Sequence, residues 1–153
     1  MIRTILLILV FLPVQVFSQK YFDKDKEHVR KDLQHYLVQN KPLNPVLTVT
    51  DSTLVLTIDE PDGPTRFIYS FDRESGKCNA QRTEANCEAC YKKYRDNLLE
   101  QKVHKWIQLN ENQYVSRYED RLLVELSAED SDYSFTVFKT HWTRDFYELL
   151  IKE

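Results

Sequence analysis

The sequence predicts an α+β fold: two tandem α-β-β-β(-β) units that form one antiparallel sheet with helices packed on one face, plus a short C-terminal helix. Three observations support this prediction. Segments with helical periodicity precede runs of β-branched and aromatic residues. This order occurs twice, over about residues 24–75 and 84–142. Two glycines against nine tyrosines and eight phenylalanines favour an ordered, packed chain over a disordered one.

The N-terminal residues 1–18 have the three-part layout of a secretory signal peptide. Arg3 supplies a positive charge, the apolar run TILLILVFLPVQVF follows, and cleavage is expected near Ser18-Gln19. A membrane anchor is the alternative, but a proline and a glutamine interrupt the run, and a spanning helix needs about 20 apolar residues. We therefore predict export to a periplasm or out of the cell. Residues 19–153 then form a single exported domain with no membrane span.

Charge and motif content argue against several classes of function. The net charge is −3 at pH 7 and basic residues form only short pairs such as Lys92-Lys93, so we expect neither nucleic acid nor an anionic membrane surface as a partner. The chain lacks G-x-S-x-G and H-E-x-x-H motifs, and its two glycines do not form a phosphate-binding loop. The four histidines share no ligand or nucleophile spacing. We therefore predict no catalytic residue, no cofactor and no metal.

The first unit begins with an amphipathic helix in DKDKEHVRKDLQHYLVQN. Asp23 or Asp25 stands near its start, and Asn40 followed by Pro42 marks its end. Three strands are predicted next, in PVLTVT, TLVLTID and TRFIYSFD, with turns at Asp51-Ser52 and PDGP between them. The predicted inward face of the helix consists of Val29, Leu33, Tyr36 and Leu37.

The second unit repeats this order. A helix is predicted in NCEACYKKYRDNLLEQ, and strands in HKWIQL, QYVSRYE, RLLVELS and DYSFTVFKT. TLVLTI and TRFIYSF align with RLLVEL and DYSFTVF, which indicates two copies of one unit. A closing helix is predicted in TRDFYELLIK, with Thr143 as the N-cap and Phe146, Leu149 and Leu150 on one side. The inward face of the NCEAC helix consists of Cys87, Cys90, Tyr91, Tyr94 and Leu98.

All three cysteines lie in the stretch GKCNAQRTEANCEAC. We place Cys78 in a loop after the third strand and favour a structural disulfide from it to Cys87 or Cys90, because exported proteins meet an oxidising compartment. Closing a loop of roughly ten residues stabilises a fold by about 2–3 kcal/mol. Such a bridge would anchor the long connection between the two units.

Besides a disulfide to another chain, two other interpretations of these cysteines stay open. Cys87 and Cys90 form a C-x-x-C at a helix N-terminus, where the helix dipole favours a reactive thiolate, but no strand of a β-α-β unit precedes it and the helix face points inward. A zinc site with Cys78, Cys87, Cys90 and His104 is the third possibility. It lacks the second pair of ligands that structural zinc modules usually have.

An antiparallel sheet covered by helices on one side keeps its other face open for binding. Aromatic and arginine side chains of the second unit are the types enriched at interaction hot spots. The candidate interaction surface consists of Tyr114, Arg117, Tyr118 and Arg121.

These observations favour an exported, soluble, non-catalytic binding or accessory protein. We expect it to bind another protein or an envelope component through the open sheet face. The alternative is a thiol-active envelope protein, an oxidoreductase or a disulfide-exchange protein, that uses Cys87-x-x-Cys90. Burial and access of these two sulfurs distinguish the alternatives.

Overall fold

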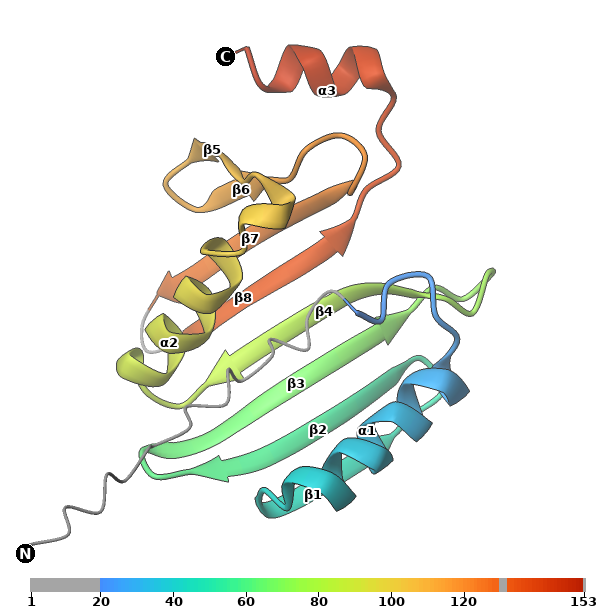
Figure 1. Ribbon diagram of the computed structural model, residues 1–153, viewed down its shortest axis with the longest axis vertical. Helices are drawn as coiled ribbons and strands as arrows, with labels where there is room; N and C mark the ends of the chain where they lie inside the picture. Colours follow the sequence, from blue (N-terminus) through green and yellow to red (C-terminus); the bar gives the residue numbers. More distant parts are fainter. Residues whose placement is uncertain (1–19, 130–131, 153) are drawn as a thin grey trace, which may run out of the picture.

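The computed structural model describes residues 20–129 and 132–152 (Figure 1). The predicted signal peptide and its cleavage point lie outside these ranges. The first part of the chain forms α1 (Lys26–Asn40), β1 (Leu43–Val49), β2 (Thr53–Glu60), β3 (Gly63–Phe71) and β4 (Cys78–Ala85). The second part forms α2 (Glu88–Leu99), a 3₁₀ turn (Lys102–His104), β5 (Ile107–Asn110), β6 (Gln113–Val115), β7 (Leu122–Glu129), β8 (Asp132–Lys139) and α3 (Arg144–Leu150).

The eight strands form one antiparallel sheet in the order β1-β2-β3-β4-β8-β7-β6-β5. The predicted mixed α+β class, with one antiparallel sheet and a C-terminal helix, is therefore confirmed. The last strand before α2 and the last strand before α3, β4 and β8, pair with each other in the middle of the sheet. The two ends of α2 thus connect a central strand to an edge hairpin.

The strand register places the apolar side chains on the helix-covered face. Leu56, Phe67, Thr83, Phe135 and Leu126 form one continuous row across five strands. Helix α1 packs against β2, whereas α2 packs against β4 and β8 (Figure 1). Both helices bury the faces that the periodicity predicts, as shown by the buried residues Val29, Leu33, Cys90, Tyr91, Tyr94 and Leu98.

Strand β4 is an element that the sequence does not reveal. Its residues, CNAQRTEA, contain a single β-branched side chain, so we predicted a loop there. The strand forms because both neighbours, β3 and β8, complete its backbone hydrogen bonds, and because Gln81, Thr83 and Ala85 alternate inward beneath the helices. Here tertiary context overrides a weak local preference.

Helix α3 starts where predicted, with the Thr143 hydroxyl accepting a hydrogen bond from the Phe146 N–H at 3.3 Å. The side that carries Phe146, Leu149 and Leu150 is not the buried side of this helix. Tyr147 is the buried residue, while Phe146 and Leu149 are exposed by 49% and 67%. Across the ranges that the structure describes, none of the helices has the length and apolar character needed to cross a membrane.

Candidate functional site

The face of the sheet opposite α1 and α2 carries a mixture of small, charged and apolar side chains. Its central row runs across five strands through Val55, Ile68, Arg82, Thr136 and Glu125. No described helix packs on this row. We call this surface the open face.

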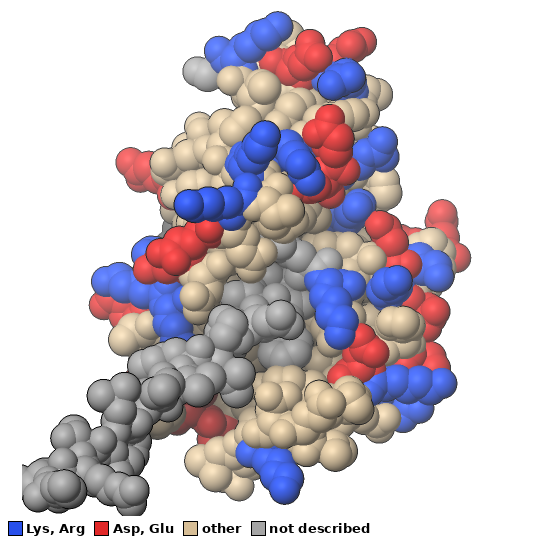
Figure 2. Space-filling view, viewed as in Figure 1, with Lys and Arg blue, Asp and Glu red and all other residues tan. Residues whose placement is uncertain are grey.

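An ion-pair network lies beside that row. Glu84 accepts from the Arg66 guanidinium at 2.7 Å and from the Arg82 guanidinium at 2.9 Å. Two arginines therefore share one carboxylate on the open face. Over the opposite, helix-bearing side of the molecule, basic and acidic side chains are interspersed (Figure 2).

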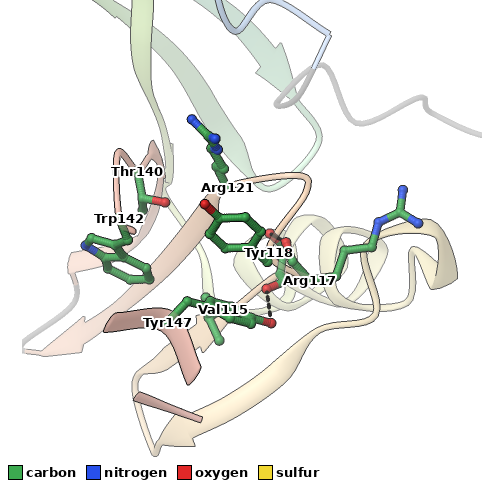
Figure 3. Close-up of a pocket in the computed structure, with 8 residues that line it drawn as sticks. Val115, Arg117, Tyr118, Arg121, Thr140, Trp142 and Tyr147 are labelled. Carbon is green, nitrogen blue, oxygen red and sulfur yellow. Dashed lines mark hydrogen bonds between the residues drawn. The ribbon is translucent and has the colours of Figure 1, made fainter. Parts of the chain in front are cut away.

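Part of the predicted interaction surface assembles around Tyr118 at one end of the sheet. The Tyr118 ring lies 5.6 Å from the Arg121 guanidinium, 5.5 Å from that of Arg144 and 5.5 Å from the Tyr147 ring. Trp142 lines the same crevice (Figure 3). We call Tyr118, Arg121, Trp142, Arg144 and Tyr147 the aromatic corner.

Two predicted residues of this surface, Tyr114 and Arg117, are not part of the aromatic corner. Strand β6 ends at Val115, so the alternation predicted for QYVSRYE stops before Arg117 and Tyr118. Tyr114 pairs with Val124 in the register and therefore faces the helix-covered core. Arg117 lines the crevice, but its guanidinium points away from it (Figure 3) and donates to Asp120 at 3.0 Å.

The aromatic corner is attached to the open face by α3. Tyr147 donates a hydrogen bond to the Ser116 carbonyl at 3.0 Å, and Val115, which shares the open face with Leu123, lines the crevice beneath it. The crevice leaves no room for a water molecule, so its walls are in contact. Arg144 and Tyr147 were missed by the sequence reasoning. The sequence pattern that could have revealed them is their position in the helix that begins after the predicted N-cap Thr143. They are three residues apart, which places both on one side of that helix.

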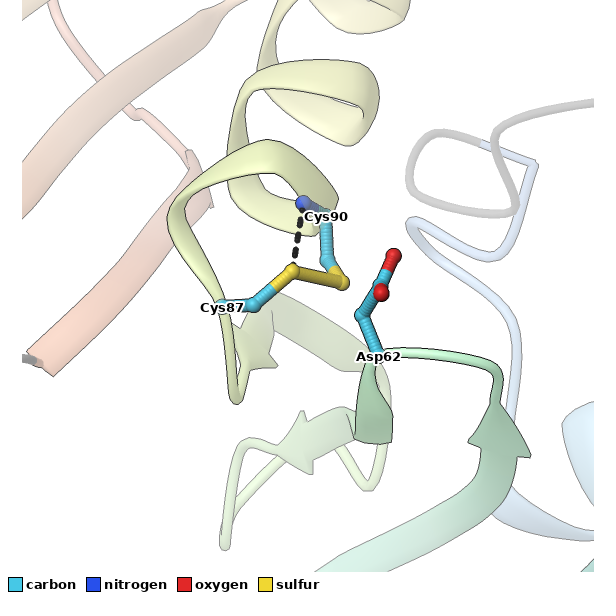
Figure 4. A group of neighbouring side chains, drawn as sticks. All are labelled: Asp62, Cys87 and Cys90. Atoms are coloured by element: carbon cyan, nitrogen blue, oxygen red, sulfur yellow. Dashed lines mark hydrogen bonds between the residues drawn. A yellow bond between two sulfur atoms is a disulfide. The ribbon is translucent and has the colours of Figure 1, made fainter.

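The cysteine site differs from the one we predicted. The disulfide joins Cys87 and Cys90 (Figure 4), and Cys78 is a buried free thiol. The favoured bridge from Cys78 is therefore wrong. Its physical reason is β4: a strand that rises about 3.3 Å per residue holds Cys78 and Ala85, at its two ends, roughly 23 Å apart.

Cys87 is the N-cap of α2. Its sulfur accepts a hydrogen bond from the Cys90 N–H at 3.0 Å. Cys87 is half-buried, whereas Cys90 is only 6% exposed, so the two sulfurs differ in access to solvent. The side chain of Asp62, in the turn between β2 and β3, faces the pair (Figure 4).

The zinc interpretation does not assemble as predicted. The donor atoms of Asp62, Cys87 and Cys90 lie within 4.8 Å of one another. Cys78 is at the far end of β4, and His104 is paired with Asp120 at 2.9 Å, on the other side of α2 in the sequence. The ligand set proposed from the sequence is therefore not brought together.

No protein-family model, no curated protein and no solved structure matches this chain. Function is therefore inferred from the geometry of the open face, the aromatic corner and the cysteine site.

Proposed function

We propose that the protein is an exported, non-catalytic binding protein that holds a partner protein or an envelope component on the open face and the aromatic corner. The observation that carries this proposal is the Tyr118 ring with two guanidinium groups, Arg121 and Arg144, beside it at the surface. Tyrosine, tryptophan and arginine are the residue types that dominate binding energy at protein interfaces. Export rests on the predicted signal peptide.

The charge of the corner supports a partner that carries acidic groups. Arg121 is exposed, and its described contact is the Tyr118 ring. Arg144 reaches Glu119 and Glu148 only at 3.9 Å and 3.6 Å. Exposed ion pairs of this kind are weak, so a carboxylate or phosphate on a partner can compete for these guanidinium groups.

The extent of the open face supports a broad contact. Small side chains, Ser70, Ala80 and Thr136, stand on it among larger ones such as Ile68 and Arg82. Val115 continues this face into the crevice under Tyr147, so the two surfaces adjoin. A partner seated on the sheet can therefore contact the corner at the same time.

We infer further that the two halves of the fold derive from one duplicated unit, which the sequence predicts at approximately residues 24–75 and 84–142; with β4 added, the first copy also has a fourth strand. Two facts support this inference: a helix followed by four strands occurs twice, and the fourth strands pair in the centre of the sheet. Duplication would explain a wide sheet with one free face.

The test is capture of partners from the envelope and secreted fractions of the source cells by immobilised protein. We compare the wild type with Arg121→Glu in the corner, Thr136→Arg in the middle of the open face, and Lys31→Glu as a matched charge reversal on the exposed side of α1. A genuine ligand is retained by wild type and Lys31→Glu, and is reduced at least about tenfold by the other two variants. Circular dichroism establishes that all variants are folded.

The captured component is then titrated against purified protein. Trp142 lines the crevice, whereas Trp106 is tied to the Leu98 carbonyl at 3.0 Å. Binding at the corner should change the fluorescence of the wild type and leave that of Trp142→Phe unchanged. Equal capture by all variants, or a fluorescence change that survives Trp142→Phe, contradicts the proposal.

A further inference from the structure

The Cys87–Cys90 disulfide does not connect separate parts of the fold. Both cysteines belong to the first turn of α2, with a sequence separation of 3. A bridge across so short a loop restricts the unfolded chain far less than one that joins distant elements. Cross-linking of distant segments therefore does not account for this disulfide, so its capacity for thiol–disulfide exchange has to be considered.

The two sulfurs are arranged unequally for that chemistry. Cys87 is half-buried and lies at the N-terminus of a helix of 12 residues, with the Cys90 N–H directed at its sulfur. Backbone N–H groups and the helix dipole at this position stabilise negative charge on a thiolate. Cys90 is 6% exposed and packs with the core. An external group thus meets Cys87 first.

The turn between β2 and β3 is held tightly against this site. A Cβ on Gly63 would lie 2.6 Å from the Asn86 side-chain nitrogen, so the turn approaches the residue before Cys87 as closely as glycine permits. Glu60, at the end of β2, anchors the same turn to α2 by accepting from Lys93 at 3.1 Å and from Tyr94 at 2.9 Å. These contacts place the Asp62 carboxylate within 4.8 Å of both sulfurs.

We propose that Cys87–Cys90 is a thiol–disulfide exchange site whose substrates are protein or peptide dithiols. The first substrate thiolate attacks the Cys87 sulfur, the bond between Cys87 and Cys90 breaks, and the electron pair leaves on Cys90, which takes up a proton. The second substrate thiolate then attacks the substrate sulfur of the mixed disulfide and releases Cys87 as a thiolate at the helix N-terminus. The substrate loses two electrons and two protons; the cysteine pair gains both electrons and one of the protons, on Cys90, and the other proton goes to solvent while Cys87 stays a thiolate. Asp62 is placed to pass a proton to Cys90.

This site is separate from the aromatic corner, so each proposal can fail without the other. Exchange is tested on the purified protein by mixing it, without oxygen, with a reduced peptide that carries two cysteines. The wild type should convert about one peptide per chain to its disulfide while its own pair becomes reduced. Cys78→Ala should do the same, because that thiol takes no part.

The roles of the two cysteines are tested in the Cys78→Ala background. With Cys90→Ser, the remaining Cys87 should form a mixed disulfide with glutathione disulfide at least about tenfold faster than Cys90 does when Cys87→Ser is introduced. Mass spectrometry identifies the adduct. Because the wild type supplies the first measurement, failure of a variant to fold does not remove the test.

Three results would overturn the proposal. They are a wild-type pair that stays oxidised while the peptide stays reduced, a Cys90 that reacts as fast as Cys87, and a reduced chain that binds zinc and fails to exchange. The last result would instead indicate a metal site made by Asp62, Cys87 and Cys90.

Discussion

The two ends of β4 offer opposite surroundings to a cysteine. At its start, Cys78 is 1% exposed, and its backbone exchanges hydrogen bonds with the segment before α1: its carbonyl accepts from Asp23 at 3.1 Å and its N–H donates to Lys24 at 2.8 Å. Just beyond its other end, Cys87 caps a helix at the surface and is oxidised. The strand separates an inert thiol from a chemically accessible one.

The difference shows that backbone path, not distance along the chain, decides which thiols can meet. Burial raises the pKa of the Cys78 thiol to about 12, although weak hydrogen bonds from Gln81 and to Ala80 work against that shift. Such a thiol is a small core residue with little reactivity. At the α2 end, Cys87 has the exposure and the polar surroundings that exchange requires, whereas its partner Cys90 is buried.

The largest expected effect is the difference in thiol reactivity between Cys87 and Cys78, which lie at the two ends of β4. After gentle reduction, a pulse of iodoacetamide under native conditions should modify Cys87 at least about a hundredfold faster than Cys78, because a pKa near 12 leaves roughly a thousandth of the usual thiolate. Peptide mapping by mass spectrometry measures both rates.

The control for this contrast is the same pulse in denaturant, where all three cysteines should react at similar rates. Equal labelling of Cys78 and Cys87 in the folded protein would show that the two ends of β4 do not differ as described.

What the sequence predicts well is the part of the fold with strong local signals. The helix faces around Val29 and Tyr94 are spaced for burial, and β2, β3, β7 and β8 are rich in branched and aromatic residues, so these elements are found where expected. The N-cap residue Thr143 likewise predicts the start of α3.

What the sequence does not predict follows from pairing between distant segments. Strand β4 depends on β3 and β8 for its hydrogen bonds, and the residues CNAQRTEA do not predict this pairing. The missed strand led directly to the wrong cysteine pairing. Asp62 was missed for a similar reason, because only the packing of Gly63 on Asn86 brings that turn to the cysteines.

The second expected effect is a difference in stability between variants of the two glycines of the chain. Gly63 starts β3 beside Asn86, and Gly76 lies in the turn before β4. Gly63→Ala should lower the free energy of unfolding by about 2–4 kcal/mol, since its φ of +126° is unsuited to other residues and the new Cβ would meet Asn86. Gly76→Ala, at a φ of +67° with open space around it, should cost only about 1 kcal/mol.

Urea denaturation of both glycine variants measures this difference. Equal losses of stability would mean that the turn next to Asn86 is not tightly packed. Gly63→Ala should also slow exchange at Cys87–Cys90, whereas Gly76→Ala should leave it unchanged.

A third effect tests the anchor of the same turn. Burial raises the pKa of Glu60, but hydrogen bonds from Thr65, Lys93 and Tyr94 outweigh it, so the pKa lies below its ordinary value. A carboxylate of this kind stabilises the fold above the unfolded pKa, near 4.3, and its contribution is lost as the pH falls through the folded pKa.

Glu60→Gln should therefore cost about 1–2 kcal/mol at pH 7 and much less at pH 3, as measured by urea denaturation at both pH values. Asp59→Asn, one position earlier at a residue that binds Asn44, is the neighbouring control and should show a smaller dependence on pH. A Glu60→Gln loss that is the same at pH 3 and pH 7 would contradict the role of the charged form.

The smallest effect concerns the carboxylate beside the sulfurs. The charged groups around Cys87 are Asp62 from the turn and, on α2, Glu88, which is paired with Lys92 at 2.6 Å. A nearby anion disfavours a thiolate, so Asp62→Asn should move the pH at which Cys87 is half-reactive, measured with Cys90→Ser, downward by up to about one unit. Asp51→Asn, in the exposed turn between β1 and β2, should leave this pH unchanged.

If Asp62→Asn has no effect on the pH profile but slows exchange in the otherwise wild-type pair, Asp62 acts on the proton of Cys90 and not through its charge on Cys87. If it changes neither, the turn contributes only packing, and the helix N-terminus alone distinguishes this end of β4 from the other.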